Sequence, residues 1–125
     1  MNDVNQSAGG SDAALTSERV LYRFAPLPYQ SLNADGEILV VNDAWTDLLG
    51  YEQDDVTGRC FDEFLVGDSV ERFDARFPAF KSDGAVSDVE FEMRHAGGHS
   101  VVVSLDGRIE YDEDGQVHRT HCQLR

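Results

Sequence analysis

The amino-acid sequence predicts an α+β domain, an antiparallel five-stranded sheet with short helices packed on one face. Two short strands, Tyr29–Ala34 and Ile38–Val41, flank an Asp-Gly turn near the start. The last third of the chain alternates apolar and polar residues over long runs, which is typical of half-buried antiparallel strands. Between these β regions, apolar residues recur at helical spacing, so the helices are expected to lie between the second and third strands.

The chain has 125 residues, which is the length of one domain. It carries 24 acidic and 10 basic residues, for a net charge of −14, and Lys81 is its one lysine. This charge argues against nucleic acid or an anionic membrane as a partner, because phosphate binding needs clustered basic side chains. Self-repulsion of this size is screened at about 1 M salt, where the Debye length is about 3 Å. The composition therefore predicts a halophilic acidic protein, similar to haloarchaeal proteins.

Composition also divides the chain into three parts. Residues 1–14 are small and polar and are expected to be a disordered lead-in, and residues 15–25 predict an N-terminal flanking helix that stops before two prolines. That helix either covers the sheet of its own domain or forms a homodimer. Residues 26–125 form the domain. The longest apolar run is Ile38–Val41, so this chain has no predicted membrane contact and is expected to be cytoplasmic.

The first strand pair and the helix after it have local signals. Asp35-Gly36 predicts a two-residue type I′ hairpin turn, which needs positive φ at both positions. Asn42 or Asp43 is placed to cap a helix that ends at Gly50.

The middle of the chain predicts short helices. Two helical turns are expected around Glu52–Val56 and Cys60–Phe64. A longer helix is expected to begin near Asp68, extend to about Phe80 and be disturbed by Pro78, because proline removes a helix hydrogen bond. Its apolar stripe is Val70, Phe73, Phe77 and Phe80.

The two long strands Ser87–His95 and Val101–Tyr111 should pair as a hairpin. An odd-length loop at residues 96–98, with a left-handed glycine, pairs Met93 with Val101 and keeps the apolar row on one face. Gly107 interrupts the inner row of the second strand, which indicates either a bulge or a close approach by another group.

The register of the last strand depends on the turn before it. If Asp114-Gly115 is a two-residue loop, Tyr111 faces His118 and Gly107 faces Cys122. The inward residues of this strand are then His118, Thr120, Cys122 and Leu124. His121 falls on the opposite face from His118, so the two could not chelate one ion together.

The front half of the domain resembles a PAS domain. The matching residues are Asp35-Gly36, Ile38, Asn42, Ala44, Leu49-Gly50-Tyr51, Glu52, Asp55-Val56 and Gly58. The later strands are similar too, so the resemblance covers roughly Tyr29 to Arg125. It implies a sensory or interaction module of a larger protein, a histidine kinase or transducer, with a C-terminal output domain. The alternative is a non-sensing dimerisation or interaction module.

No cofactor is expected. Cys60 follows Gly58-Arg59, but the spacing and the acidic neighbours differ from those of the flavin-binding members of the family. The helix region 68–81 lacks the histidine with which haem-binding members hold iron. No metal-ligand spacing or catalytic motif is present, so this chain is not expected to be an enzyme.

The predicted interior offers a small-molecule pocket, since it combines an apolar lining with a few inward polar groups. A core filled by the same side chains fits the pattern as well. The candidate pocket residues are Trp45, Phe61, Phe64, Phe73, Phe77, Met93, Val103, Tyr111, His118, Thr120 and Cys122.

Overall fold

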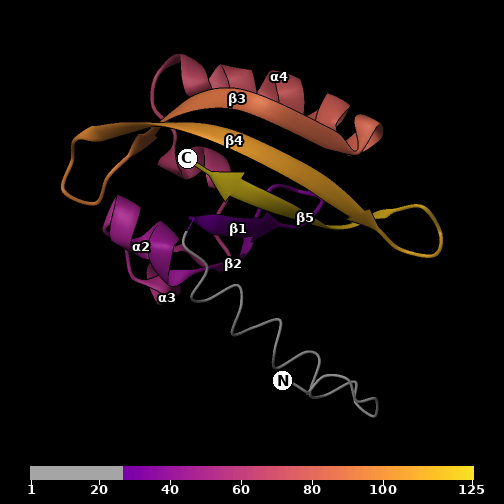
Figure 1. The fold of residues 1–125 in the computed structure, drawn as a ribbon, viewed down its shortest axis with the longest axis horizontal. Coiled ribbons are helices and arrows are strands. Elements are labelled where there is room, and N and C mark those ends of the chain that lie inside the picture. Colours follow the sequence, from indigo (N-terminus) through magenta and orange to yellow (C-terminus); the bar gives the residue numbers. More distant parts are fainter. Residues whose placement is uncertain (1–26) are drawn as a thin grey trace, which may run out of the picture.

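The computed structural model describes residues 27–125 and shows one antiparallel sheet (Figure 1). Its strands are β1 (Tyr29–Leu32), β2 (Ile38–Val41), β3 (Ala85–Arg94), β4 (Ser100–Tyr111) and β5 (Val117–Leu124). They lie in the order β2-β1-β5-β4-β3, so the last strand of the chain is in the middle of the sheet. The predicted fold class is confirmed.

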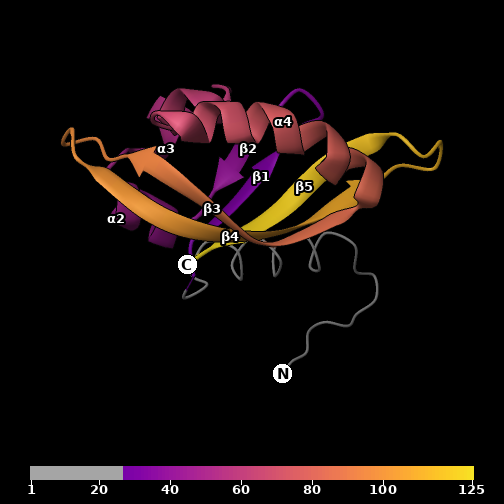
Figure 2. The ribbon, with the colours of Figure 1, turned by 90° about the horizontal axis from the view of Figure 1, so that it is seen from above.

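Helices connect β2 to β3. They are α2 (Asp43–Leu49), α3 (Gln53–Val56), the 3₁₀ helix η2 (Phe61–Phe64) and α4 (Asp68–Asp83). Figure 2 shows α4 lying across one face of the curved sheet. Within residues 27–125, no helix is long and apolar enough to cross a bilayer. The predicted lead-in (1–14) and flanking helix (15–25) lie outside the described residues.

The predicted ends of α2 are confirmed. The side chain of Asn42 accepts a hydrogen bond from the backbone N–H of Trp45 at 3.0 Å, which satisfies one of the free donors of the first turn. The helix ends at Gly50, whose φ of +82° is the left-handed conformation expected there.

Helix α4 is longer than predicted. It continues through Pro78 to Asp83, although an interior proline removes one backbone hydrogen bond. Phe77 and Phe80 are buried in the core, and their packing holds the turns on either side of the proline. Burial of an aromatic side chain contributes about 1.5–3 kcal/mol, which offsets the lost hydrogen bond.

The first hairpin turn differs from the predicted type I′ turn. The N–H of Asn33 donates to the carbonyl of Glu37 at 2.9 Å, and the N–H of Gly36 donates to the carbonyl of Asn33 at 3.0 Å. Among the described residues only Asp88 has positive φ without being glycine, so Asp35 lacks the conformation that a type I′ turn needs. The loop is therefore one of three residues in which a single glycine, Gly36, is left-handed.

The β4–β5 turn repeats this geometry and changes the register. Here the N–H of Asp112 donates to the carbonyl of Gln116 at 2.8 Å, and a shift between Glu110 and Tyr111 sets Tyr111 opposite Val117. His118 is the extra residue in this bulge. The predicted pairing of Tyr111 with His118 is therefore wrong.

The rest of the predicted register is confirmed. Leu105 pairs with Leu124, Gly107 with Cys122, and Ile109 with Thr120. In the β3–β4 hairpin, Met93 pairs with Val101, and Gly98 supplies the left-handed residue with φ +101°.

Gly107 lies where another side chain approaches the sheet. A Cβ atom at this position would lie 2.9 Å from Cζ of Phe80 and 3.0 Å from Sγ of Cys122. The close approach suggested by the sequence is thus present. A bulge also occurs nearby, but in β3, where the register shifts between Val86 and Val89.

Candidate functional site

A small cavity lies inside the domain, between α4 and the sheet. Its volume is about 30 Å³. Its lining is Gln30, Leu32, Phe61, Phe73, Arg76, Phe77, Phe80, Val86, Val89, Phe91, Leu105 and Cys122. Most of these side chains are apolar. Gln30, with its amide, and Arg76, with its guanidinium, are the strongly polar residues of the lining.

Gln30 is held in one orientation by Trp45. Gln30 pairs with Cys122 across β1 and β5, and its side chain is fully buried. The indole N–H of Trp45 donates to Oε1 of Gln30 at 2.9 Å. Because an indole nitrogen can only donate, the amide oxygen must face Trp45. The amide nitrogen, Nε2, is left with no hydrogen-bond partner among the described residues.

The predicted pocket residues separate into three groups. Phe61, Phe73, Phe77 and Cys122 line the cavity. Trp45, Phe64, Met93, Val103 and Thr120 are buried but lie elsewhere in the core. Tyr111 and His118 are exposed: Tyr111 has 42% of its surface accessible, and the side chain of His118 has 55%. Tyr111 nevertheless keeps its predicted side of the sheet, since its hydroxyl donates to the carbonyl of Lys81 in α4 at 2.7 Å. The predicted inward orientation of His118 is wrong, because the bulge turns this side chain toward Glu110 on the outer face.

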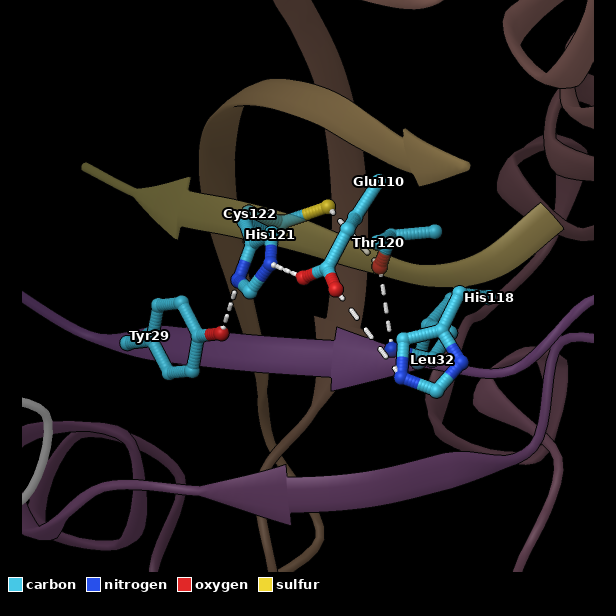
Figure 3. Close-up of polar contacts among 7 residues, drawn as sticks. All are labelled: Tyr29, Leu32, Glu110, His118, Thr120, His121 and Cys122. Atoms are coloured by element: carbon cyan, nitrogen blue, oxygen red, sulfur yellow. Dashed lines mark hydrogen bonds and ion pairs between the residues drawn. The ribbon is translucent and has the colours of Figure 1, made fainter. Parts of the chain in front are cut away.

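A polar network occupies the outer face of the sheet (Figure 3). The Tyr29 hydroxyl lies 2.5 Å from Nδ1 of His121, and Nε2 of His121 lies 2.7 Å from Oε1 of Glu110. The other carboxylate oxygen of Glu110 is 3.8 Å from Nε2 of His118. The two histidines thus approach one carboxylate, which corrects the prediction that they lie on opposite faces. The hydrogen bond from His121 lowers the pKa of Glu110 below its ordinary value.

Inward polar groups of β5 are satisfied within the core. Thr120 Oγ1 accepts from the N–H of Leu32 at 2.9 Å, and the Cys122 thiol points to the same oxygen at 3.6 Å (Figure 3). Burial raises the pKa of Cys122 to about 12, so this thiol stays protonated.

Cys60 also has an unreactive environment. Burial, followed by the negative charges of Asp62 and Glu37, raises the pKa of its thiol. Acidic neighbours therefore oppose a thiolate here, as the sequence indicates. Within residues 27–125, no group of three or more acidic, histidine or cysteine side chains is arranged to hold a metal ion.

Eight residues of the cavity wall are not among the pocket residues predicted from the sequence: Gln30, Leu32, Arg76, Phe80, Val86, Val89, Phe91 and Leu105. Gln30 could have been found from the β1–β5 pairing, which places it opposite the inward Cys122. The short strand β1 has four consecutive buried residues, so its own alternation gave no signal.

An antiparallel sheet of this order, with helices on one face and a small apolar cavity beneath them, defines a PAS-like α+β domain. A model of the PAS fold matches residues 38–123, and the chain belongs to that family. Among curated proteins, none matches.

Solved structures with the same fold agree with this assignment. The PAS domain of an HTR-like protein from Haloarcula marismortui is 26% identical, with a TM-score of 0.74, and the match covers 90% of this chain and 92% of that one. A PAS domain of a LuxR-family transcriptional regulator from Burkholderia thailandensis, solved in complex with ethanol, is 22% identical (TM-score 0.70; 86% and 94% covered). A PAS domain from a two-component sensor histidine kinase is 15% identical (TM-score 0.77; 93% and 98% covered).

Proposed function

We propose that this PAS domain is the sensory module of a larger signalling protein. In this proposal it detects a small ligand or a partner and passes a conformational change to an output region that follows Arg125. The position of β5 carries the proposal. This strand contributes Cys122 to the cavity wall, is paired on both sides, and leads directly to Arg125. A shift at the cavity therefore reaches the end of the domain through one strand.

Arg125 is tied to the neighbouring strands. Its guanidinium contacts Asp88 at 2.8 Å and Asp106 at 2.7 Å, so the end of β5 is linked to β3 and β4. In this proposal the two contacts are either formed, as in this structure, or broken, and switching between two such arrangements is a known route by which a signal leaves a domain. A ligand shifts such an equilibrium only by binding one state better, at about 1.4 kcal/mol for each tenfold preference.

Similar proteins support the same reading. One relative comes from a sensor histidine kinase and another has ethanol bound, which fits an interior that accepts molecules of a few atoms. The acidic composition, together with the Haloarcula marismortui relative, supports a haloarchaeal histidine kinase or transducer as the parent protein.

The test is a thermal-shift screen of small metabolites on the purified domain. Compounds that bind the cavity should raise the melting temperature of the wild type and of His118→Leu, since His118 is exposed. They should not raise that of Cys122→Leu, whose larger side chain fills the cavity. Circular dichroism checks that this variant folds, because overpacking costs about 1–3 kcal/mol.

The same variants are then placed in the full-length protein, and output is measured with and without the binding compound. Loss of the response in Cys122→Leu alone supports the proposal. If no compound shifts the melting temperature and Cys122→Leu leaves output unchanged, the domain is not a ligand sensor.

A second candidate function is a dimerisation or docking module. It is favoured by the small volume of the cavity, about 30 Å³, and by Val102, which is 61% exposed on the outer face of the sheet. In that case output depends on the association of the domain and not on a ligand.

A further inference from the structure

Strand β3 lies at the edge of the sheet. Within the described sheet it has a neighbour, β4, on one side only. An edge strand of ten residues presents a row of backbone N–H and C=O groups, and such a row is a template on which another chain can add a strand. The partners of these groups therefore decide whether the edge is open or closed.

Two side chains cap carbonyl groups on the open side of β3. Nη1 of Arg72, in α4, donates to the carbonyl of Glu90 at 2.7 Å. The hydroxyl of Tyr51 donates to the carbonyl of Arg94 at 2.8 Å. A strand added at this edge would have to displace both side chains.

The residue midway between these two, Glu92, is closed by the start of α4. Its N–H donates to Oγ of Ser69 at 2.7 Å, and its carbonyl accepts from the N–H of Val66 at 3.0 Å. Ser69 and Arg72 are three residues apart on α4, so they lie on the same side of the helix, and both bond to β3. Loss of the Arg72 bond should therefore also loosen the helix start that covers Glu92, since segments held by few contacts open first.

The beginning of β3 is closed by a bulge. The register shifts between Val86 and Val89, and Asp88 has a φ of +54°. The N–H of Asp88 donates to Oδ1 of Asp106 at 2.8 Å, and its carboxylate pairs with Arg125 at 2.8 Å. A backbone that turns in this way interrupts the ladder that an added strand would need.

Negative charge protects this edge only at low salt. Glu90 and Glu92 are exposed on the outer face of β3. Like charges that face each other across paired strands are destabilising, so the two side chains disfavour pairing with an acidic strand. At about 1 M salt the Debye length is about 3 Å, and this repulsion is largely screened. The hydrogen-bonded caps are then the protection that remains.

We propose that Arg72 keeps closed a strand-pairing surface on β3, and that the partner it excludes is the same edge of a second copy. Antiparallel pairing that uses all three open-side residues of both copies sets Glu92 opposite Glu92 and Glu90 opposite Arg94. This register has two pairs of opposite charge and one pair of like charge, so a second copy fits the edge once it is open. Two identical edges pair about a two-fold axis, which gives a closed dimer. The inference goes beyond the sensory function and does not depend on a ligand.

The experiment compares Arg72→Ala with Arg76→Ala in the full chain. Both substitutions remove one arginine from α4, but Arg76 has no hydrogen bond or ion pair with the residues that the structure describes. Sedimentation velocity measures the dimer fraction at about 0.1 M and about 2 M KCl, between which the Debye length falls from about 10 Å to below 3 Å. Circular dichroism checks that each variant is folded.

Two further variants locate the contact and test the hydrogen bond. In a strand the N–H and C=O of one residue point to the same side, so the N–H of Glu90 faces the open edge, as its carbonyl does. Proline is tolerated at such a position but blocks an added strand, which makes Arg72→Ala with Glu90→Pro the test of location. Arg72→Lys keeps the positive charge and a donor.

At high salt, Arg72→Ala should dimerise about three- to tenfold more tightly than Arg76→Ala. This is the effect of losing one hydrogen bond that holds the edge closed, because the dissociation constant falls as the open fraction rises. At low salt the difference should shrink, since Glu90 and Glu92 repel an acidic strand. Arg72→Ala with Glu90→Pro should return to the level of Arg76→Ala, and Arg72→Lys should behave like the wild type.

Three results would overturn the inference. Equal dimer fractions in Arg72→Ala and Arg76→Ala at high salt would mean that the edge stays closed without Arg72. A dimer that persists with Glu90→Pro would place the new contact on another surface. An increase at low salt as large as that at high salt would mean that charge does not protect this edge. None of these results bears on the sensory proposal, which is tested by the metabolite screen and by output of the full-length protein.

Discussion

The side chain of Asn42 joins the start of α2 to the start of β1. Its Oδ1 accepts from the backbone N–H of Tyr29 at 2.9 Å as well as from Trp45, and its Nδ2 donates to the carbonyl of Leu27 at 3.0 Å. One buried amide therefore satisfies backbone groups of two elements. This role exceeds that of an ordinary helix cap.

Asn42→Ala is expected to lower the free energy of unfolding by about 2–4 kcal/mol. A cap alone contributes about 1 kcal/mol, and the buried groups left without partners add to the loss. Urea denaturation measures it. Asn33→Ala is the control in the first turn, whose Asn33 is only partly buried, and it should cost less. Equal losses in the two variants would contradict the double role of Asn42.

Gly50 and Gly58 share a left-handed backbone but differ in the space around them, so substitutions at the two positions separate the cost of backbone strain from the cost of a steric clash. Both have positive φ, +82° and +88°. A Cβ at Gly50 would lie 2.6 Å from the His95 ring, whereas a Cβ at Gly58 meets nothing within 4 Å. Gly58→Ala should cost about 1–2 kcal/mol from the left-handed conformation alone. Gly50→Val should cost clearly more, and adding His95→Ala should recover part of the difference. Thermal unfolding of these three variants and the wild type checks this.

Stability should depend on pH through Glu110. Its folded pKa is lowered below the ordinary value of 4.5 by the bond from His121 and by the charges of His121, His118 and Arg119. A depressed carboxylate pKa gives stability that is present above the unfolded pKa and is lost as the pH falls through the folded pKa. Because the side chain is 48% exposed, the effect should be under about 1 kcal/mol. The wild type should be slightly more stable than Glu110→Gln at pH 7, and the difference should vanish well below pH 4.5.

Salt should stabilise the protein. With a net charge of −14, the folded chain repels itself at low ionic strength. The melting temperature should therefore rise by many degrees between low and molar KCl, as measured by differential scanning calorimetry. A melting temperature that is constant over this range would contradict a halophilic adaptation.

Association is the last prediction. The domain should form a weak homodimer through residues 15–25 and the outer sheet face that carries Val102. Val117 is not part of this face, because the register pairs it with Tyr111, whose hydroxyl contacts α4. Deleting residues 1–25 should lower the dimer fraction in sedimentation velocity, and Val102→Asp in the intact chain should do the same. A dimer unchanged by both would place the interface elsewhere.

The strands and helices could be predicted because their patterns are long. Met93 and Val101 fall in register since the apolar row must stay on one face, and this holds for most of β4 and β5. The hairpin turns could not be predicted from Asp-Gly alone. In both hairpins the side chain just before the loop helps to set the length of the loop. Asn33 Oδ1 accepts a hydrogen bond from the backbone N–H of Asp35, and Asp112 Oδ1 accepts one from the backbone N–H of Asp114. These local bonds favour the longer loop over a two-residue turn.

The cavity residues could be predicted only in part, because the position of some of them depends on a bulge or on a distant partner strand. The aromatic wall follows from helical spacing, so Phe73 and Phe77 were found. His118 was misplaced because one extra residue in a strand reverses the direction of its side chain. Gln30 was missed because its role depends on a partner strand at the other end of the sequence.

That distant pairing also determines when the domain can form. Gln30 pairs with Cys122, so the centre of the sheet closes only when the last described strand has been synthesised. Until then β1 and β4 expose unpaired edges, which favour association with other chains. Contacts this far apart in sequence slow folding, because the loop between them must close first. A ribosome that pauses before residue 117 would therefore hold an aggregation-prone intermediate with an open gap in its sheet.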